Sequence, residues 1–105
     1  MATTNELVAV LSRHIGRGNG VSGKALAAAL GIETRQLRKL VTEAIEDGQI
    51  AICGHPSTGY FVAASAEELI ETIEFHDHRA KHELKKKSRL AKMLGDLYGQ
   101  IYLPT

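Results

Sequence analysis

The chain has 105 residues, which is enough for one domain with a modest core. Aromatic residues make up only 5% of the sequence, so the core must be mainly aliphatic. The net charge of +1 does not by itself indicate a nucleic-acid partner, and any such function would depend on local charge. The single cysteine, Cys53, excludes an internal disulfide and a cysteine-based zinc site, and it fits a reducing, cytoplasmic compartment.

The first part of the sequence predicts two short helices. Residues 4–14 carry apolar side chains at near-helical spacing behind Thr4 or Asn5 as a cap, and the glycines of residues 16–20 break that helix. These glycines do not predict a nucleotide-binding loop, because no strand precedes them and the lysine spacing is wrong. Ser22 is expected to cap the second helix, and Gly31 to end it in a left-handed conformation.

A third helix is predicted from about Thr34 to Asp47, with Gly48 ending it. One face should be buried, because its apolar residues recur three and four apart: Leu37, Leu40, Val41, Ala44 and Ile45. Residues 49–53 and 60–64 then read as two strands, joined by the turn formers of residues 54–59.

The last predicted element is a long helix. Ser65 and Glu68 predict a capping box at its start, and Gly95 is expected to end it, which gives a length of roughly 45 Å. Such a helix exceeds what the small body can cover, so part of it should project or pack on another chain. The expected organisation is therefore a domain at residues 1–64, the long helix at residues 65–95 and an apolar tail at residues 96–105. The fold class is mainly α with a small β-hairpin.

Four residues carry a resemblance to a known family. Ala27 stands four residues before the turn glycine Gly31, and Leu37 and Leu40 stand six and nine residues after it. This pattern, followed by a hairpin, resembles the winged helix-turn-helix family of bacterial and phage regulators over residues 4–64. The resemblance implies that the third helix lies in the major groove of DNA.

The resemblance also implies a set of DNA-binding residues. Arginine can pair with guanine and glutamine with adenine, whereas lysine and threonine more often hold phosphates. The helix residues implied are Thr34, Arg35, Gln36, Arg38, Lys39 and Thr42, with Lys24 on the preceding helix and His55, Ser57 and Thr58 in the wing. The alternative is that the cations merely solvate an exposed helix face.

The long helix is divided by charge, with acids from Glu67 to Asp77 and bases from Arg79 to Lys92, interrupted only by Glu83. Three interpretations remain open: complementing the helix dipole, antiparallel self-pairing, or contact between the basic half and DNA. A broken apolar stripe predicts a dimerisation surface. Its residues are Ile73, Ala80, Leu84, Ala91 and Leu94.

The sequence predicts neither an enzyme nor a cofactor or metal site. His78 and His82 share a helix face, but Arg79 and Lys81 lie between them and no catalytic glutamate accompanies them. Cys53 is expected to be a small buried hydrophobe. The start of the sequence predicts no signal peptide, and no apolar run is long enough for a membrane span, so no membrane partner is expected.

The sequence thus predicts a small transcriptional or replication regulator that binds double-stranded DNA. One copy offers about three to five phosphate contacts, whereas tight binders make roughly 6–10, so a homodimer is expected through the C-terminal helix. The alternative is a protein-interaction module, an adaptor or inhibitor that docks on a larger assembly without binding DNA. The near-neutral net charge and the uncharged wing favour this alternative.

Overall fold

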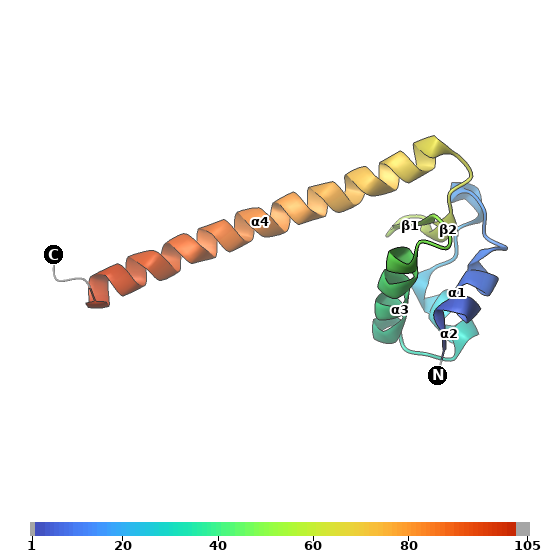
Figure 1. The fold of residues 1–105 in the computed structure, drawn as a ribbon, viewed down its shortest axis with the longest axis horizontal. Helices are drawn as coiled ribbons and strands as arrows, with labels where there is room; N and C mark the ends of the chain where they lie inside the picture. Colours follow the sequence, from blue (N-terminus) through green and yellow to red (C-terminus); the bar gives the residue numbers. More distant parts are fainter. Residues whose placement is uncertain (1, 103–105) are drawn as a thin grey trace. The chain divides into compact units, whose positions relative to one another are not determined.

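The computed structural model describes residues 2–102, with side chains up to residue 98. The elements are α1 (Thr4–Leu11), a 3-10 turn η1 (Arg17–Asn19), α2 (Gly23–Leu30), α3 (Thr34–Asp47), β1 (Ile52–His55), β2 (Gly59–Val62) and α4 (Ala66–Tyr102) (Figure 1). The chain is mainly helical, with a two-stranded antiparallel sheet and a long C-terminal helix, as predicted. It divides into two units, Met1–Ile73 and Glu74–Thr105, so the first turns of α4 belong to the N-terminal unit.

Local capping places the first three helices. The cap of α1 is Thr3, whose side chain accepts a hydrogen bond from the Glu6 N–H at 3.2 Å, so the expected cap at Thr4 or Asn5 is wrong. Ser22 caps α2 by accepting from the Ala25 N–H at 3.1 Å, as predicted. Gly31 ends α2 at φ 68°, which confirms its predicted left-handed conformation. Gly48 ends α3, as predicted, and is also left-handed at φ 69°.

Helix α1 ends at Leu11, short of the predicted residue 14. The residues that follow pair with β2 instead of continuing the helix. The His14 carbonyl accepts from the Val62 N–H at 2.7 Å, and the Gly16 N–H donates to the Val62 carbonyl at 2.8 Å. Periodicity alone predicted helix here, but a tertiary backbone pairing competes for the same groups.

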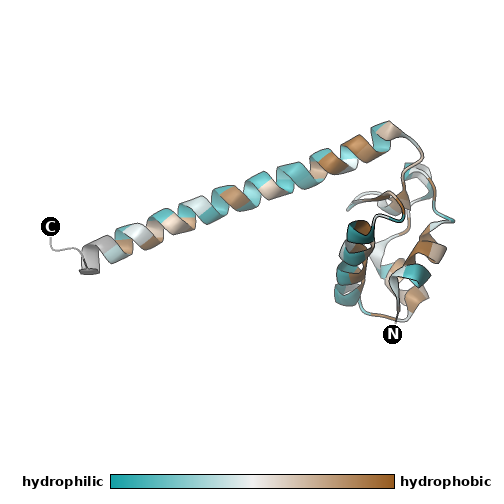
Figure 2. Cartoon of the chain, in the orientation of Figure 1, coloured by the Kyte–Doolittle hydropathy of each residue, from teal (hydrophilic) through white to brown (hydrophobic). Residues whose placement is uncertain are grey.

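The core lies where α1 and α2 pack against α3. It is aliphatic, as the composition predicts, and its buried members include Leu7, Leu11, Leu26, Leu37, Leu40, Val41, Ala44 and Ile52. Ile45 was expected on the buried face of α3 but is 45% exposed. Figure 2 shows the hydrophilic side that α3 presents away from this core.

The hairpin is shifted from its predicted position. Strand β1 begins at Ile52, and the paired residues run from Ile52 with Val62 to His55 with Gly59. The Thr58 N–H closes the turn onto the His55 carbonyl at 3.1 Å. The turn is thus shorter than the composition of residues 54–59 suggested, because His55 and Gly59 still pair across it. Cys53 is fully buried in β1, as predicted.

A second backbone pairing joins β2 to the segment before α2. The Val21 N–H donates to the Tyr60 carbonyl at 2.9 Å, and the Tyr60 N–H donates to the Val21 carbonyl at 2.7 Å. The backbones approach so closely that a Cβ on Gly20 would lie 1.9 Å from the Thr58 carbonyl oxygen. Gly59 has φ 76°, and a Cβ there would lie 2.3 Å from the Val21 carbonyl oxygen. These glycines therefore hold the hairpin against the helices.

The start of α4 is anchored by Glu68. The Ser65 hydroxyl accepts from the Glu68 N–H at 3.3 Å, which is one half of the predicted capping box. The Glu68 carboxylate does not return to Ser65; it accepts from the Ala64 N–H at 2.8 Å and from the Arg17 N–H at 3.0 Å. Those two donors hold the pKa of Glu68 below its ordinary value of 4.5. Arg17 also forms an ion pair with Glu71.

Helix α4 does not end at Gly95 as predicted but continues to Tyr102, so its 37 residues span about 55 Å. A glycine inside a helix costs only about 1 kcal/mol, and neighbours with helical preference carry the helix across it. From Glu74 to Tyr98 every side chain is exposed except that of Phe75, which is half-buried. Within residues 2–102, no helix combines the length and apolar character needed to cross a membrane.

The close approach at Gly20 generates a stability prediction. We expect Gly20→Ala to lower the free energy of unfolding by about 2 kcal/mol or more, because its Cβ would overlap backbone that cannot rotate away. Gly18→Ala is the matched control, since a Cβ at Gly18 meets nothing within 4 Å, and it should change stability by less than about 0.5 kcal/mol. Denaturant unfolding of both variants measures the difference. Equal effects would contradict the packing described for Gly20.

The anchoring of α4 generates a pH prediction. Because the folded pKa of Glu68 is lowered, its contribution to stability is present above pH 4.5 and is lost as the pH falls through that lowered pKa. We therefore expect Glu68→Gln to melt below the wild type at pH 7, and the two melting temperatures to converge as the pH falls below 4.5 and through the lowered pKa. Glu67→Gln, at an exposed neighbouring position, is the control and should not reproduce this convergence. A gap that stays constant with pH would exclude the charge of Glu68 as the cause.

Candidate nucleic-acid interface

The exposed face of α3 is the candidate interface. All six residues predicted on it are exposed: Thr34, Arg35, Gln36, Arg38, Lys39 and Thr42. They are positioned by the opposite face, where Leu37, Leu40, Val41 and Ala44 are buried. Since helical residues three and four apart share a face, burying these four aliphatic residues fixes where the polar side chains point.

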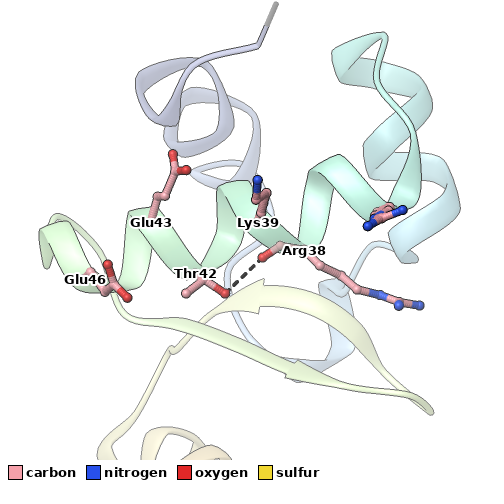
Figure 3. A pocket seen from close by; sticks show the side chains of 6 residues that line it. Arg38, Lys39, Thr42, Glu43 and Glu46 are labelled. Carbon is pink, nitrogen blue, oxygen red and sulfur yellow. Dashed lines mark hydrogen bonds between the residues drawn. The ribbon is translucent and has the colours of Figure 1, made fainter.

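Two rows of side chains line a shallow depression of about 460 Å³ on this face (Figure 3). One row is Arg35, Lys39 and Glu43, and the other is Arg38, Thr42 and Glu46, each spaced by four residues. The structure thus brings together four predicted residues and adds two carboxylates that the sequence analysis did not include. The regular spacing of four was the signal that could have revealed them.

Charge changes sign along the depression. The cations of Arg35, Arg38 and Lys39 lie on the first turns of α3, and Glu43 and Glu46 lie nearer its C-terminal end. Among the described residues, no ion pair within 4 Å engages these three cations. The helix dipole adds positive potential at the same end, where Glu33 partly offsets it. The face can therefore attract an anion at its N-terminal half only.

Gln36 has a structural function in this conformation. Its side-chain oxygen accepts from the Glu33 N–H at 3.0 Å and so caps α3. Bidentate pairing with adenine requires both the oxygen and the amino group of glutamine. Gln36 would have to leave the cap to make that pairing. Likewise, the Thr42 hydroxyl already donates to the Arg38 carbonyl at 3.0 Å, so it would have to turn before donating to a phosphate.

The remaining predicted DNA contacts lie outside this depression. Lys24 is exposed in the first turn of α2. In the hairpin turn, the Ser57 N–H donates to His55 Nδ1 at 3.1 Å, and the Ser57 hydroxyl lies 2.7 Å from the same nitrogen. The Thr58 hydroxyl donates to the Gly59 carbonyl at 3.3 Å. These polar groups thus form hydrogen bonds within the hairpin turn, and the turn contains no Lys or Arg.

The predicted dimerisation residues are all exposed on α4: Ile73, Ala80, Leu84, Ala91 and Leu94. The structure adds exposed apolar residues on the C-terminal part of the same helix: Leu90, Met93, Leu97 and Tyr98. Leu97 and Tyr98 were missed because the predicted helix ended at Gly95, whereas Leu90 and Met93 lie inside the predicted helix but were not assigned to its apolar stripe. Their spacing of three and four beyond Leu90 was the available signal.

No cluster of three or more His, Cys, Asp or Glu side chains that could hold a metal ion occurs in the part of the chain that the structure describes. His78 and His82 are exposed on α4. The chain matches no protein-family model, and comparison with curated proteins and with solved structures finds no match for it either.

The cap made by Gln36 predicts that removing its side chain destabilises the fold. Gln36→Ala should lower the free energy of unfolding by roughly 0.5–1 kcal/mol, because it removes the bond to the Glu33 N–H. Without that bond, alanine would be neutral or slightly stabilising, since its helix propensity exceeds that of glutamine. Lys39→Ala, at an exposed site on the same helix, serves as the control in chemical denaturation. A variant as stable as the control would mean that Gln36 does not cap α3.

Proposed function

We propose that this chain is a winged helix-turn-helix protein that binds double-stranded DNA and acts as a small transcriptional or replication regulator. Three features support the proposal. Helices α2 and α3 meet at the left-handed Gly31, α3 keeps a buried aliphatic face, and a hairpin follows α3 directly. The proposal assigns no reaction to the chain.

The observation that carries the proposal is the unpaired basic half of the α3 face. Arg35 and Arg38 have exposed guanidinium groups with no ion-pair partner among the described residues, so they are available for guanine or phosphate. Lys39 is suited to a phosphate as a point charge. Glu43 and Glu46 would repel phosphates from the other half, so DNA should engage only the first turns of α3.

The small number of cations sets the expected affinity. Arg35, Arg38, Lys39 and Lys24 give about four phosphate or base contacts per copy, fewer than the roughly 6–10 of tight binders. Useful affinity therefore requires two copies on one DNA, and the exposed apolar residues of α4 provide a means of pairing them. The proposed active species is a homodimer.

One specific observation favours a second candidate function. The hairpin tip has no cation, and its His55, Ser57 and Thr58 side chains bond within the turn. A tip of this kind suits contact with another protein better than insertion into a minor groove. The second candidate is accordingly a protein-interaction module that uses the same fold without DNA.

Binding to duplex DNA of random sequence tests the proposal. With about four contacts in each copy of the dimer, the dissociation constant should rise on the order of 10,000-fold between 50 and 200 mM salt. Arg35→Ala combined with Arg38→Ala should remove about two contacts from each copy, weaken binding and flatten the dependence of log K on log salt by about 3.6. Fluorescence anisotropy of labelled DNA gives both quantities.

A matched control removes two cations from α4. Lys85→Ala combined with Lys92→Ala leaves α3 intact and should preserve the binding and its salt slope if α3 is the interface. If the α4 pair weakens binding as much as the α3 pair does, the basic half of α4 contacts the DNA. Absence of binding at low salt would reject the DNA proposal and leave the protein-interaction module.

A further inference from the structure

An exposed stripe with a seven-residue repeat runs along α4. Its members alternate three and four apart: Ile70, Ile73, Asp77, Ala80, Leu84, Lys87, Ala91 and Leu94. All of them are exposed, including Ile70 and Ile73 at 51% and 58%. This spacing is that of the contact seam of a two-stranded coiled coil, in which two positions are here occupied by charges.

The stripe is distinct from the face by which α4 packs on the N-terminal unit. That packing face includes the half-buried Leu69 and the buried Thr72, and Glu68 on it reaches the Arg17 N–H. Ile73 lies one turn after Leu69 at the edge of this packing face, and Ile70 lies farther from it, but both are more than half exposed. The exposed parts of these side chains are thus available to a partner.

We propose that the stripe binds the α4 helix of a second copy in antiparallel orientation, in the register that places Asp77 opposite Lys87 of the second copy. This inference rests on the dimeric part of the proposed function but not on DNA binding. In this register Ile70 faces Leu94, Ile73 faces Ala91, and Ala80 faces Leu84 of the second copy. The two-fold symmetry repeats each layer.

Charge selects this arrangement over the alternatives. A parallel dimer in register would stack Asp77 on Asp77 and Lys87 on Lys87, and would bury two like-charge pairs. An antiparallel dimer shifted by seven residues in one direction would place Asp77 against Leu94 and Lys87 against Leu84. The opposite shift would place them against Ala80 and Ile70. Only the proposed register gives each buried charge an opposite partner.

The wider charge pattern agrees with the antiparallel orientation. In this register residues 72–77 run beside residues 87–92 of the second copy, which brings Glu74 and Asp77 beside a basic segment. Near the two-fold axis, Lys81 approaches Lys81 of the second copy, and Glu83 approaches Glu83 of the second copy. Both have an opposite charge on the same helix, with Lys81 2.9 Å from Asp77 and Glu83 3.3 Å from Lys86.

Charge exchange between the two positions tests the register. Asp77→Lys and Lys87→Asp should each raise the dimer dissociation constant at least tenfold, because each places like charges in a buried layer. The double exchange should restore dimerisation to within about threefold, since the opposite charges face each other again. Lys85→Asp is the matched control. It makes the same charge change as Lys87→Asp at a residue outside the stripe, so its dimer dissociation constant should stay near that of the wild type. Sedimentation equilibrium of the full chain measures all five proteins, and circular dichroism checks that each stays helical.

A distance measurement tests orientation independently. In the proposed register Gly95 faces residue 69 of the second copy. Residue 95 of the second copy lies about 26 residues farther along that helix. Spin labels at Gly95→Cys should therefore lie about 39 Å apart along the axis, whereas a parallel dimer would hold them close to its interaxial distance of about 10 Å. Cys53 is fully buried and stays in place.

The outcomes separate this inference from the proposed function. A wild type that stays monomeric, single exchanges that dimerise like wild type, a double exchange that fails to recover, or a short label distance would each overturn the inference. If the Arg35 and Arg38 double variant loses DNA binding but still dimerises, the inference about the α4 dimer is supported. Dimerisation as described together with no DNA binding would reject the DNA function alone.

Discussion

The backbone pairing of Val21 with Tyr60 is the constraint on which the N-terminal unit depends. It forces two chain segments so close that neither Gly20 nor Gly59 can carry a side chain. Without this pairing, a two-stranded hairpin would be at best marginally stable, because it has no third strand and only one face on the core. With it, the hairpin lies against the helices, and η1 is placed where the Arg17 N–H reaches Glu68. One backbone contact thus fixes both the hairpin and the start of α4.

The fold and the candidate interface use different residues of the same helix. Four buried aliphatic residues make α3 amphipathic and determine its rotation on the body: Leu37, Leu40, Val41 and Ala44. Arg35, Arg38 and Lys39 contribute little to that packing, since they are exposed and form no ion pair among the described residues. Their positive charge is therefore not required by the fold. A binding function would account for the presence of these exposed cations.

Sequence reasoning predicted most of the local helix ends, although it placed the cap of α1 at Thr4 or Asn5 instead of Thr3. Ser22, Gly31 and Gly48 occupy their expected cap positions, because a cap depends on only a few neighbouring residues. It failed where distant groups compete for the same atoms. The pairing of His14 with Val62 shortens α1, and the Arg17 N–H takes the carboxylate that Glu68 was expected to turn toward Ser65. In the candidate site, the exposed residues of α3 were predictable from period, whereas the use of Gln36 as a cap was not.

In the proposed dimer, the charges of the α4 stripe have a specific consequence. Leucine at both positions 77 and 87 would bury more apolar surface and pair more strongly, but it would allow parallel, antiparallel and shifted dimers alike. Asp77 and Lys87 lower the stability of the dimer compared with leucine at both positions. In return, every register except the proposed one would bury an unpaired charge.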